Sequence, residues 1–141
     1  MGLSSKLNYK KWEFSFSSRF SIGNYVYNNV SSNSYYRHLY TDGRIINNLS
    51  KSIEKTNFNE QQMQSEYYVE NASFFKMDYM SLGYEFDKIL NKKVGINLTA
   101  TLQNAFVITG YSGQDPEVVG GIDYCGYPRP RTLSMKLSLV F

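Results

Sequence analysis

The sequence feature that most constrains the fold is an alternation of apolar and polar residues at the carboxyl end of the 141-residue chain. Every second residue of this stretch is apolar: Leu133, Met135, Leu137, Leu139 and Phe141. Successive side chains of an extended strand point to opposite faces, so these side chains share one face. Ser134, Lys136 and Ser138 lie between them, on the other face. We therefore expect a strand with one face against an apolar medium.

The same alternation recurs earlier in the chain and predicts further strands. In residues 12–22 it is broken only at Ser18, and in residues 94–103 it is not broken at all. We expect strands over residues 2–9, 12–23, 74–86, 93–106 and 131–141. Several of them reach the roughly 9–11 residues that a tilted strand needs to cross a lipid bilayer. The pattern predicts an all-β, antiparallel transmembrane β-barrel portion of about five strands.

The connections between these strands alternate in length. Short links at 10–11 and 87–92 alternate with long ones at 24–73 and 107–130. Short periplasmic turns and long extracellular loops are typical of outer-membrane barrels. Aromatic residues fall at the short-link end, where a barrel has an aromatic girdle at the membrane interface: Tyr9, Trp12, Tyr84 and Phe86. Connections and aromatic residues thus both favour a barrel wall.

Reactive and metal-ligating residues are too few for a catalytic or metal site. Cys125 is the only cysteine and His38 the only histidine, so no internal disulfide and no metal-binding cluster are expected. No nucleophile has an evident base, and no carboxylate pair is placed for acid–base chemistry. The net charge of +3 is spread along the chain, without the basic block typical of nucleic-acid binding. We expect no enzyme activity, no cofactor and no nucleic-acid partner.

Two local patterns carry structural predictions. Ile46, Leu49 and Ile53 recur at helical spacing and indicate a short amphipathic helix. Around Asp78 the apolar residues change from odd to even positions. Either a bulge lies near Asp78, or the upper part of this strand stands clear of the membrane. His38 is expected to pack among the tyrosines of its loop.

Four stretches, in this order and spacing, resemble the carboxy-terminal end of RagA/SusC-type TonB-dependent outer-membrane transporters. They are NYKKWEFSFSSRFSIGNYVYNN, YYVENASFFKMDYMSLGYEF, NAFVITGYSGQDPEV and GYPRPRTLSMKLSLVF. The resemblance implies that residues 1–141 are the last strands of a plugged 22-stranded barrel in the outer membrane. It also implies import of large nutrients, often glycans or oligosaccharides. A SusD-like lipoprotein would close the mouth, and a TonB complex would act through the plug.

Members of this family carry a signal peptide and a plug domain, and we expect neither within these residues. This expectation predicts a fragment. An odd number of strands also leaves one end of the chain outside, and an open sheet leaves two unpaired edges in lipid. We therefore expect the remainder of the barrel and the plug, or other copies of the chain, to complete the sheet. Glu13, Arg19 and Lys136, on its polar face, would line the lumen.

Two groups of residues are candidates for contact with partners. The terminal row resembles the signal that the barrel-assembly machinery reads by strand pairing, and it comprises Met135, Leu137, Leu139 and Phe141. It also suits an ordinary lipid-facing strand. The second group is a loop that in the family lies near substrate and the SusD-like partner: Tyr111, Gln114 and Asp115. Asp115 precedes a proline, so an ordinary turn also explains this residue.

Two other classes of protein remain open. A small self-assembling outer-membrane porin would close one barrel from several copies of the chain, and would show discrete conductance steps. A soluble carbohydrate-binding β-sheet protein would stack exposed tyrosines on sugars, and would be a monomer without detergent.

Overall fold

The computed structural model describes residues 1–38, 49–89 and 94–140, and the chain forms two compact units. The first, here called the sheet unit, comprises Met1–Ser21, Phe74–Ile108 and Arg129–Phe141. The second, called the loop unit, comprises Ile22–Ser73 and Thr109–Pro128. The chain therefore leaves the sheet unit twice, and each excursion contributes one part of the loop unit.

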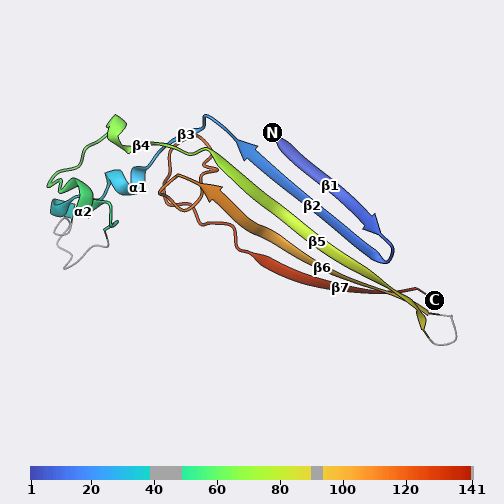
Figure 1. Ribbon diagram of the computed structural model, residues 1–141. Coiled ribbons are helices and arrows are strands. Elements are labelled where there is room, and N and C mark those ends of the chain that lie inside the picture. Colours follow the sequence, from blue (N-terminus) through green and yellow to red (C-terminus); the bar gives the residue numbers. More distant parts are fainter. Residues whose placement is uncertain (39–48, 90–93, 141) are drawn as a thin grey trace. The chain divides into compact units, whose positions relative to one another are not determined.

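Long strands form one sheet in the sheet unit. They are β1 (Gly2–Tyr9), β2 (Trp12–Ser21), β5 (Phe74–Ile89), β6 (Val94–Thr109) and β7 (Thr132–Val140). Their spatial order is β1-β2-β5-β6-β7, so each strand lies beside the next long strand of the chain (Figure 1). The ladders of β1 with β2, of β2 with β5 and of β6 with β7 are antiparallel. The predicted antiparallel sheet is confirmed, and the predicted strand bounds agree with the observed ones to within three residues.

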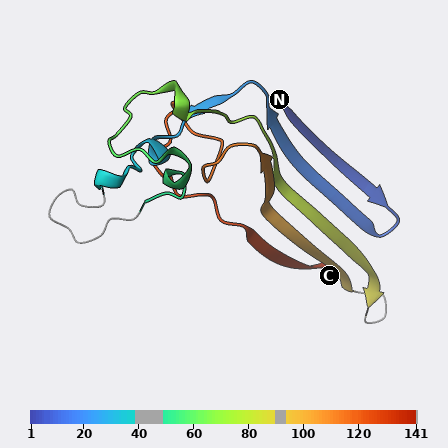
Figure 2. The same cartoon turned by 60° about the vertical axis from the view of Figure 1, so that its left-hand side comes forward.

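The two edges of this sheet are β1 and β7, which Figure 2 shows on its opposite sides. The turn from β1 to β2 consists of Lys10 and Lys11, and it places Tyr9 opposite Trp12. Lys10 has a φ of 53°, the left-handed conformation that two-residue hairpins need. The register of this hairpin is therefore defined although its turn lacks the usual glycine.

The ladder between β2 and β5 contains a β-bulge at Asp78. Ser17 and Ser18 are consecutive in β2, but they face Tyr79 and Met77, so β5 has one extra residue. One extra residue reverses the alternation of side chains along the rest of a strand. The apolar residues on both sides of the bulge consequently share one face, although their positions change from odd to even. The bulge that the sequence offered as one of two alternatives is confirmed.

Across the ladders, apolar residues pair with apolar ones. Phe14 lies opposite Leu82, and Leu98 lies opposite Leu137. Eight aliphatic side chains of this face are between 40% and 74% exposed: Leu3, Leu7, Leu82, Leu98, Leu133, Met135, Leu137 and Leu139. We call these residues the apolar face. Its exposure shows that the sheet unit does not bury this face by itself.

The loop unit has a small core and short elements. These elements are β3 (Tyr25–Tyr27), α1 (Asn29–Ser32), α2 (Ile53–Thr56), η2 (Glu66–Tyr68) and β4 (Val69–Asn71). Strands β3 and β4 pair antiparallel and were not predicted, because three residues are too few to show an alternation. Val26, Ala72 and Tyr111 form the core, and Val118 packs against them. In the described residues, no helix is long and apolar enough to cross a membrane.

The helix predicted from Ile46, Leu49 and Ile53 is shorter than expected. Helix α2 begins only at Ile53, Leu49 precedes it, and Ile46 lies outside the described residues. The N–H group of Ser50 donates to the Oγ atom of Ser34 at 3.0 Å. This contact holds the backbone before α2 to another segment, so the helical spacing in the sequence does not become one continuous helix.

Candidate functional site

The four predicted interface aromatics lie at one end of the sheet, beside the turn of Lys10 and Lys11. The rings of Trp12 and Tyr84 meet edge to face with centroids 4.6 Å apart, and those of Tyr84 and Phe86 with centroids 4.7 Å apart. Tyr9 lies opposite Trp12 in the ladder. Edge-to-face contacts of this kind stabilise the end of a sheet beyond simple burial. The structure therefore brings all four side chains to the place where a girdle was expected.

The predicted assembly row lies on strand β7. Met135, Leu137 and Leu139 belong to the apolar face and are 74%, 62% and 49% exposed, while Phe141 lies outside the described residues. Strand β7 pairs with β6 on one side only. Its other edge therefore presents backbone N–H and C=O groups that another strand can pair with.

The opposite face of the sheet carries polar contacts. Arg19 donates from Nε and Nη2 to the two carboxylate oxygens of Asp78, at 2.7 and 2.8 Å. Two parallel hydrogen bonds make this the strongest type of ion pair, and they also hold the bulge residue on the polar face. Ser81 and Thr101 hydrogen-bond across β5 and β6 at 3.0 Å. The polar positions predicted from the alternation therefore do share one face.

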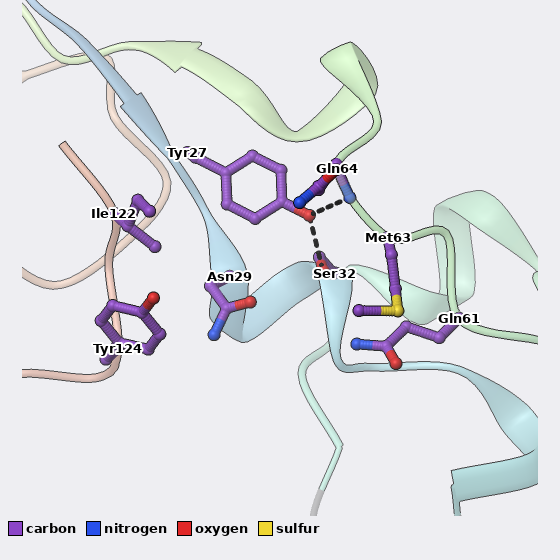
Figure 3. Close-up of a pocket in the computed structure, with 8 residues that line it drawn as sticks. All are labelled: Tyr27, Asn29, Ser32, Gln61, Met63, Gln64, Ile122 and Tyr124. Carbon is purple, nitrogen blue, oxygen red and sulfur yellow. Dashed lines mark hydrogen bonds between the residues drawn. The ribbon is translucent and has the colours of Figure 1, made fainter.

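A pocket of about 350 Å³ lies within the loop unit. Three segments supply its lining residues, which Figure 3 shows: Tyr27, Asn29, Ser32, Gln61, Met63, Gln64, Ile122 and Tyr124. The Tyr27 hydroxyl donates to Ser32 Oγ at 2.9 Å and accepts from the N–H group of Gln64 at 3.1 Å. This hydroxyl therefore joins two of the three segments. No pattern in the sequence indicates the pocket, because its residues come from distant positions without a common period.

The third segment of the pocket is held by Asp123, which stands between Ile122 and Tyr124. The carboxylate of Asp123 accepts from the Tyr111 hydroxyl at 2.8 Å and from the Cys125 N–H group at 2.8 Å. Burial, followed by the hydrogen bond and the charge of Asp123, raises the pKa of Tyr111 above its ordinary value. Tyr111 thus anchors one wall of the pocket from inside the core.

The three residues of the predicted contact loop lie in different environments. Tyr111 is only 6% exposed, so its side chain does not reach the surface of the loop unit. Gln114 is exposed, and Asp115 is half-buried. The Asp115 carboxylate accepts from the N–H group of Glu117 at 3.0 Å, which is the Asx turn expected of Asp before proline. Among these three residues, Gln114 is the side chain best placed for contact.

The histidine and the cysteine have the surroundings of ordinary loop residues. The rings of His38 and Tyr35 lie with centroids 5.3 Å apart, as expected of a histidine packed beside tyrosine. Cys125 is exposed. Within residues 1–38, 49–89 and 94–140, no group of three or more His, Cys, Asp or Glu side chains is arranged to hold a metal ion.

The fold and the two faces of the sheet define a class of protein. Long antiparallel strands with an exposed apolar face and a polar opposite face are typical of a transmembrane β-barrel wall. No family model matches the chain. Two similar proteins identify the class more closely.

The chain is 40% identical over 150 aligned residues to the TonB-dependent receptor SusC of Bacteroides thetaiotaomicron, and the alignment includes the whole chain. It is 27% identical over 163 residues to the TonB-dependent receptor P39 of Formosa agariphila. The chain spans 15% of the length of SusC and 16% of that of P39. It is therefore homologous to one segment of the SusC-type TonB-dependent receptors, and the predicted resemblance is confirmed.

Solved structures share the fold of this segment. The match to the RagAB peptide importer in its closed-closed state covers 98% of this chain and 16% of the importer chain, with a TM-score of 0.75 and 20% identity. The match to the importer in its open-open state covers 99% of this chain and 17% of the importer chain, with a TM-score of 0.73 and 18% identity. At this identity the likeness shows the fold alone.

Proposed function

We propose that the chain forms part of the wall and the extracellular loops of an outer-membrane TonB-dependent importer of large nutrients. The observation that carries this proposal is the 40% identity to SusC along the whole chain. In the proposal, residues 1–141 are the carboxy-terminal part of the barrel. The sheet unit spans the outer membrane, and the loop unit contributes to the extracellular mouth. The role is transport, without a catalytic step.

The apolar face supports contact with lipid. Monomeric soluble proteins rarely expose a continuous apolar patch larger than a few hundred Å². The apolar face runs over β1, β5, β6 and β7, and its aliphatic side chains are 40% exposed or more. Hydrocarbon is the medium in which such a face is stable, and the aromatic cluster at its end suits the lipid headgroups. A soluble carbohydrate-binding sheet would leave this face in water.

The edges of the sheet support a larger barrel. Hydrocarbon does not tolerate unpaired backbone groups, so β1 and β7 need further strands beside them. In the proposal the remainder of the barrel supplies these strands. A porin made from copies of this chain would instead join β1 to β7. The first and last of five up-and-down strands run in the same direction, so this seam would be parallel, unlike the antiparallel strands of known outer-membrane barrels.

The partners in this proposal follow from the class of protein. A SusD-like lipoprotein would cover the extracellular mouth, with Gln114 and Asp115 as contact residues. A TonB complex would act through the plug, and the barrel-assembly machinery would read the row of Met135, Leu137 and Leu139 during insertion. The transported nutrient is proposed to be a glycan or oligosaccharide.

An experiment in the native host tests the proposal. The complete gene, with an epitope tag, is expressed from its own locus, and the tagged protein is followed through separation of the inner and outer membranes. We expect the protein in the outer membrane, with a lipoprotein that co-purifies in mild detergent. Uptake of fluorescent oligosaccharides should stop on deletion of the gene or on collapse of the proton gradient, and complementation should restore it. A tagged protein in the soluble fraction would contradict the proposal.

A further inference from the structure

A second pocket of the loop unit carries positive charge, and we call it the lysine pocket. Its volume is about 470 Å³, and two of its lining residues are Lys51 and Lys55, which lie four positions apart at α2. Both side chains are exposed, and among the described residues neither ammonium group takes part in an ion pair. Most of the other lining side chains carry hydroxyl groups, which can donate hydrogen bonds. The lysine pocket therefore combines available positive charge with hydroxyl donors.

The carboxylate at this pocket is occupied by neutral partners. Glu70 accepts at Oε1 from Asn28 Nδ2 at 2.9 Å and from Ser112 Oγ at 2.7 Å. At Oε2 it accepts from the N–H group of Ser112 at 2.9 Å. Glu70 thus joins three segments of the loop unit, and its oxygens are not turned to the lysines. The charge of the two lysines is left for a ligand that binds beside residues 51–55.

The hydroxyl of Ser52, another lining residue, lacks a partner. Its Oγ atom is buried and makes no hydrogen bond. Ser52 precedes the first residue of α2, where a serine usually accepts from a backbone N–H group, but its side chain makes no such contact. A buried hydroxyl without a partner destabilises a protein. A turn of this side chain about its Cα–Cβ bond would bring the hydroxyl to a ligand, and a hydrogen bond there would remove the cost.

From these contacts we infer that the lysine pocket binds a doubly charged tetrahedral oxyanion, a phosphate or sulfate group. Two ammonium groups match its two charges, and the hydroxyl groups match its several oxygen atoms. A carboxylate has one charge and two oxygens, so it satisfies the pocket less well. The site goes beyond the proposed importer function. A cavity of about 470 Å³ is within the range of sites for whole small molecules, so it admits an organic phosphate or sulfate ester as well as the free ion.

Phosphorus NMR on the complete encoded protein in uncharged detergent tests the site. Inorganic phosphate is titrated with the protein, and the width of its resonance measures binding. We expect K51Q/K55Q to weaken binding at least about tenfold, since each ammonium group contributes a charged hydrogen bond. K51R/K55R is the matched control, because it keeps both charges and should retain most of the binding. S52A changes no charge and should weaken binding about tenfold as well.

Competition at constant ionic strength identifies the ligand. We expect sulfate to displace phosphate and acetate to require at least about tenfold more, because acetate has one charge. Glycerol 3-phosphate should compete if the natural ligand is an ester, and its exclusion would assign the free ion.

Three results would overturn the site. They are a phosphate resonance that the protein does not broaden, broadening that K51Q/K55Q or S52A leaves unchanged, and acetate that competes as well as sulfate. The importer proposal has separate readouts, the membrane fraction and the uptake measurement.

Discussion

The hydrogen bond between Tyr111 and Asp123 can be removed with a single substitution that keeps the core packed. Y111F deletes the hydroxyl that donates to the Asp123 carboxylate at 2.8 Å, and it retains the ring beside Val26 and Ala72. Asp123 is 6% exposed, so water cannot readily replace the lost donor. We expect the segment that carries Ile122 and Tyr124 to loosen.

The magnitude follows from the charge of the acceptor. A hydrogen bond to a charged group contributes about 1.5–3 kcal/mol, more than one between neutral groups. Asp123 keeps the bond from the Cys125 N–H group, so the loss should be about 2 kcal/mol and should not unfold the loop unit completely. This free energy corresponds to roughly a 30-fold increase in the population of the open segment.

Hydrogen exchange measures this opening directly. In the native structure the Asp123 N–H group bonds to the carbonyl of Tyr27, so its exchange rate reports the closed segment. We expect Y111F to accelerate this exchange roughly 30-fold and Y124F to leave it unchanged, because Tyr124 is 73% exposed. Equal exchange rates in Y111F and the native protein would refute the anchoring role of Tyr111.

The remaining predictions concern pH and the sheet. The pKa of Tyr111 is raised in the folded state, so the contribution of this tyrosine to stability is complete below about pH 10 and is lost as the pH rises towards the folded pKa. In an alkaline titration followed by absorbance at 295 nm, Tyr111 should therefore ionise at a higher pH than the exposed tyrosines, and the loop unit should unfold as it does so. L137R places a charge on the apolar face and should destabilise the protein in lipid vesicles by about 2–4 kcal/mol in urea titrations, whereas S138R on the polar face should have an effect near zero. Deletion of Asp78 removes the extra residue of the bulge and leaves the apolar residues of β5 at every second position, so gel mobility should show a folded form for this variant as well as for D78N, which keeps the bulge. A deletion variant that shows no folded form would contradict the assigned register.

The strands could be predicted because alternation is a local property of the sequence. Residues 94–103 and 133–139 alternate without a break, and both form strands with the expected faces. The change of parity at Asp78 indicated a bulge for the same reason, since an inserted residue is visible in the pattern itself. The predicted helix began too early in the chain, whereas α2 begins at Ile53. The spacing of apolar residues carries no information about the contact between Ser50 and Ser34, which lies just before α2.

The pocket could not be predicted, because its walls depend on contacts between distant segments. Tyr27, Gln64 and Tyr124 are brought together by the pairing of β3 and by Asp123, and neither contact leaves a periodic signal. The same limit explains why the buried position of Tyr111 was not predicted. A tyrosine in a glycine-rich loop resembles a contact residue in the sequence, and only the tertiary structure shows that its hydroxyl serves a buried carboxylate.

The central claim is that one face of the sheet meets lipid and the other does not. Site-directed spin labelling along β7 measures this most directly, with single cysteines at positions 133–139 in a Cys125→Ser background of the complete protein in lipid vesicles. Collision rates with oxygen, which dissolves in lipid, and with a water-soluble nickel complex are compared at each position. The account predicts a period of two, with oxygen contact highest at 133, 135, 137 and 139. A flat profile, or nickel contact highest at these four positions, would contradict it.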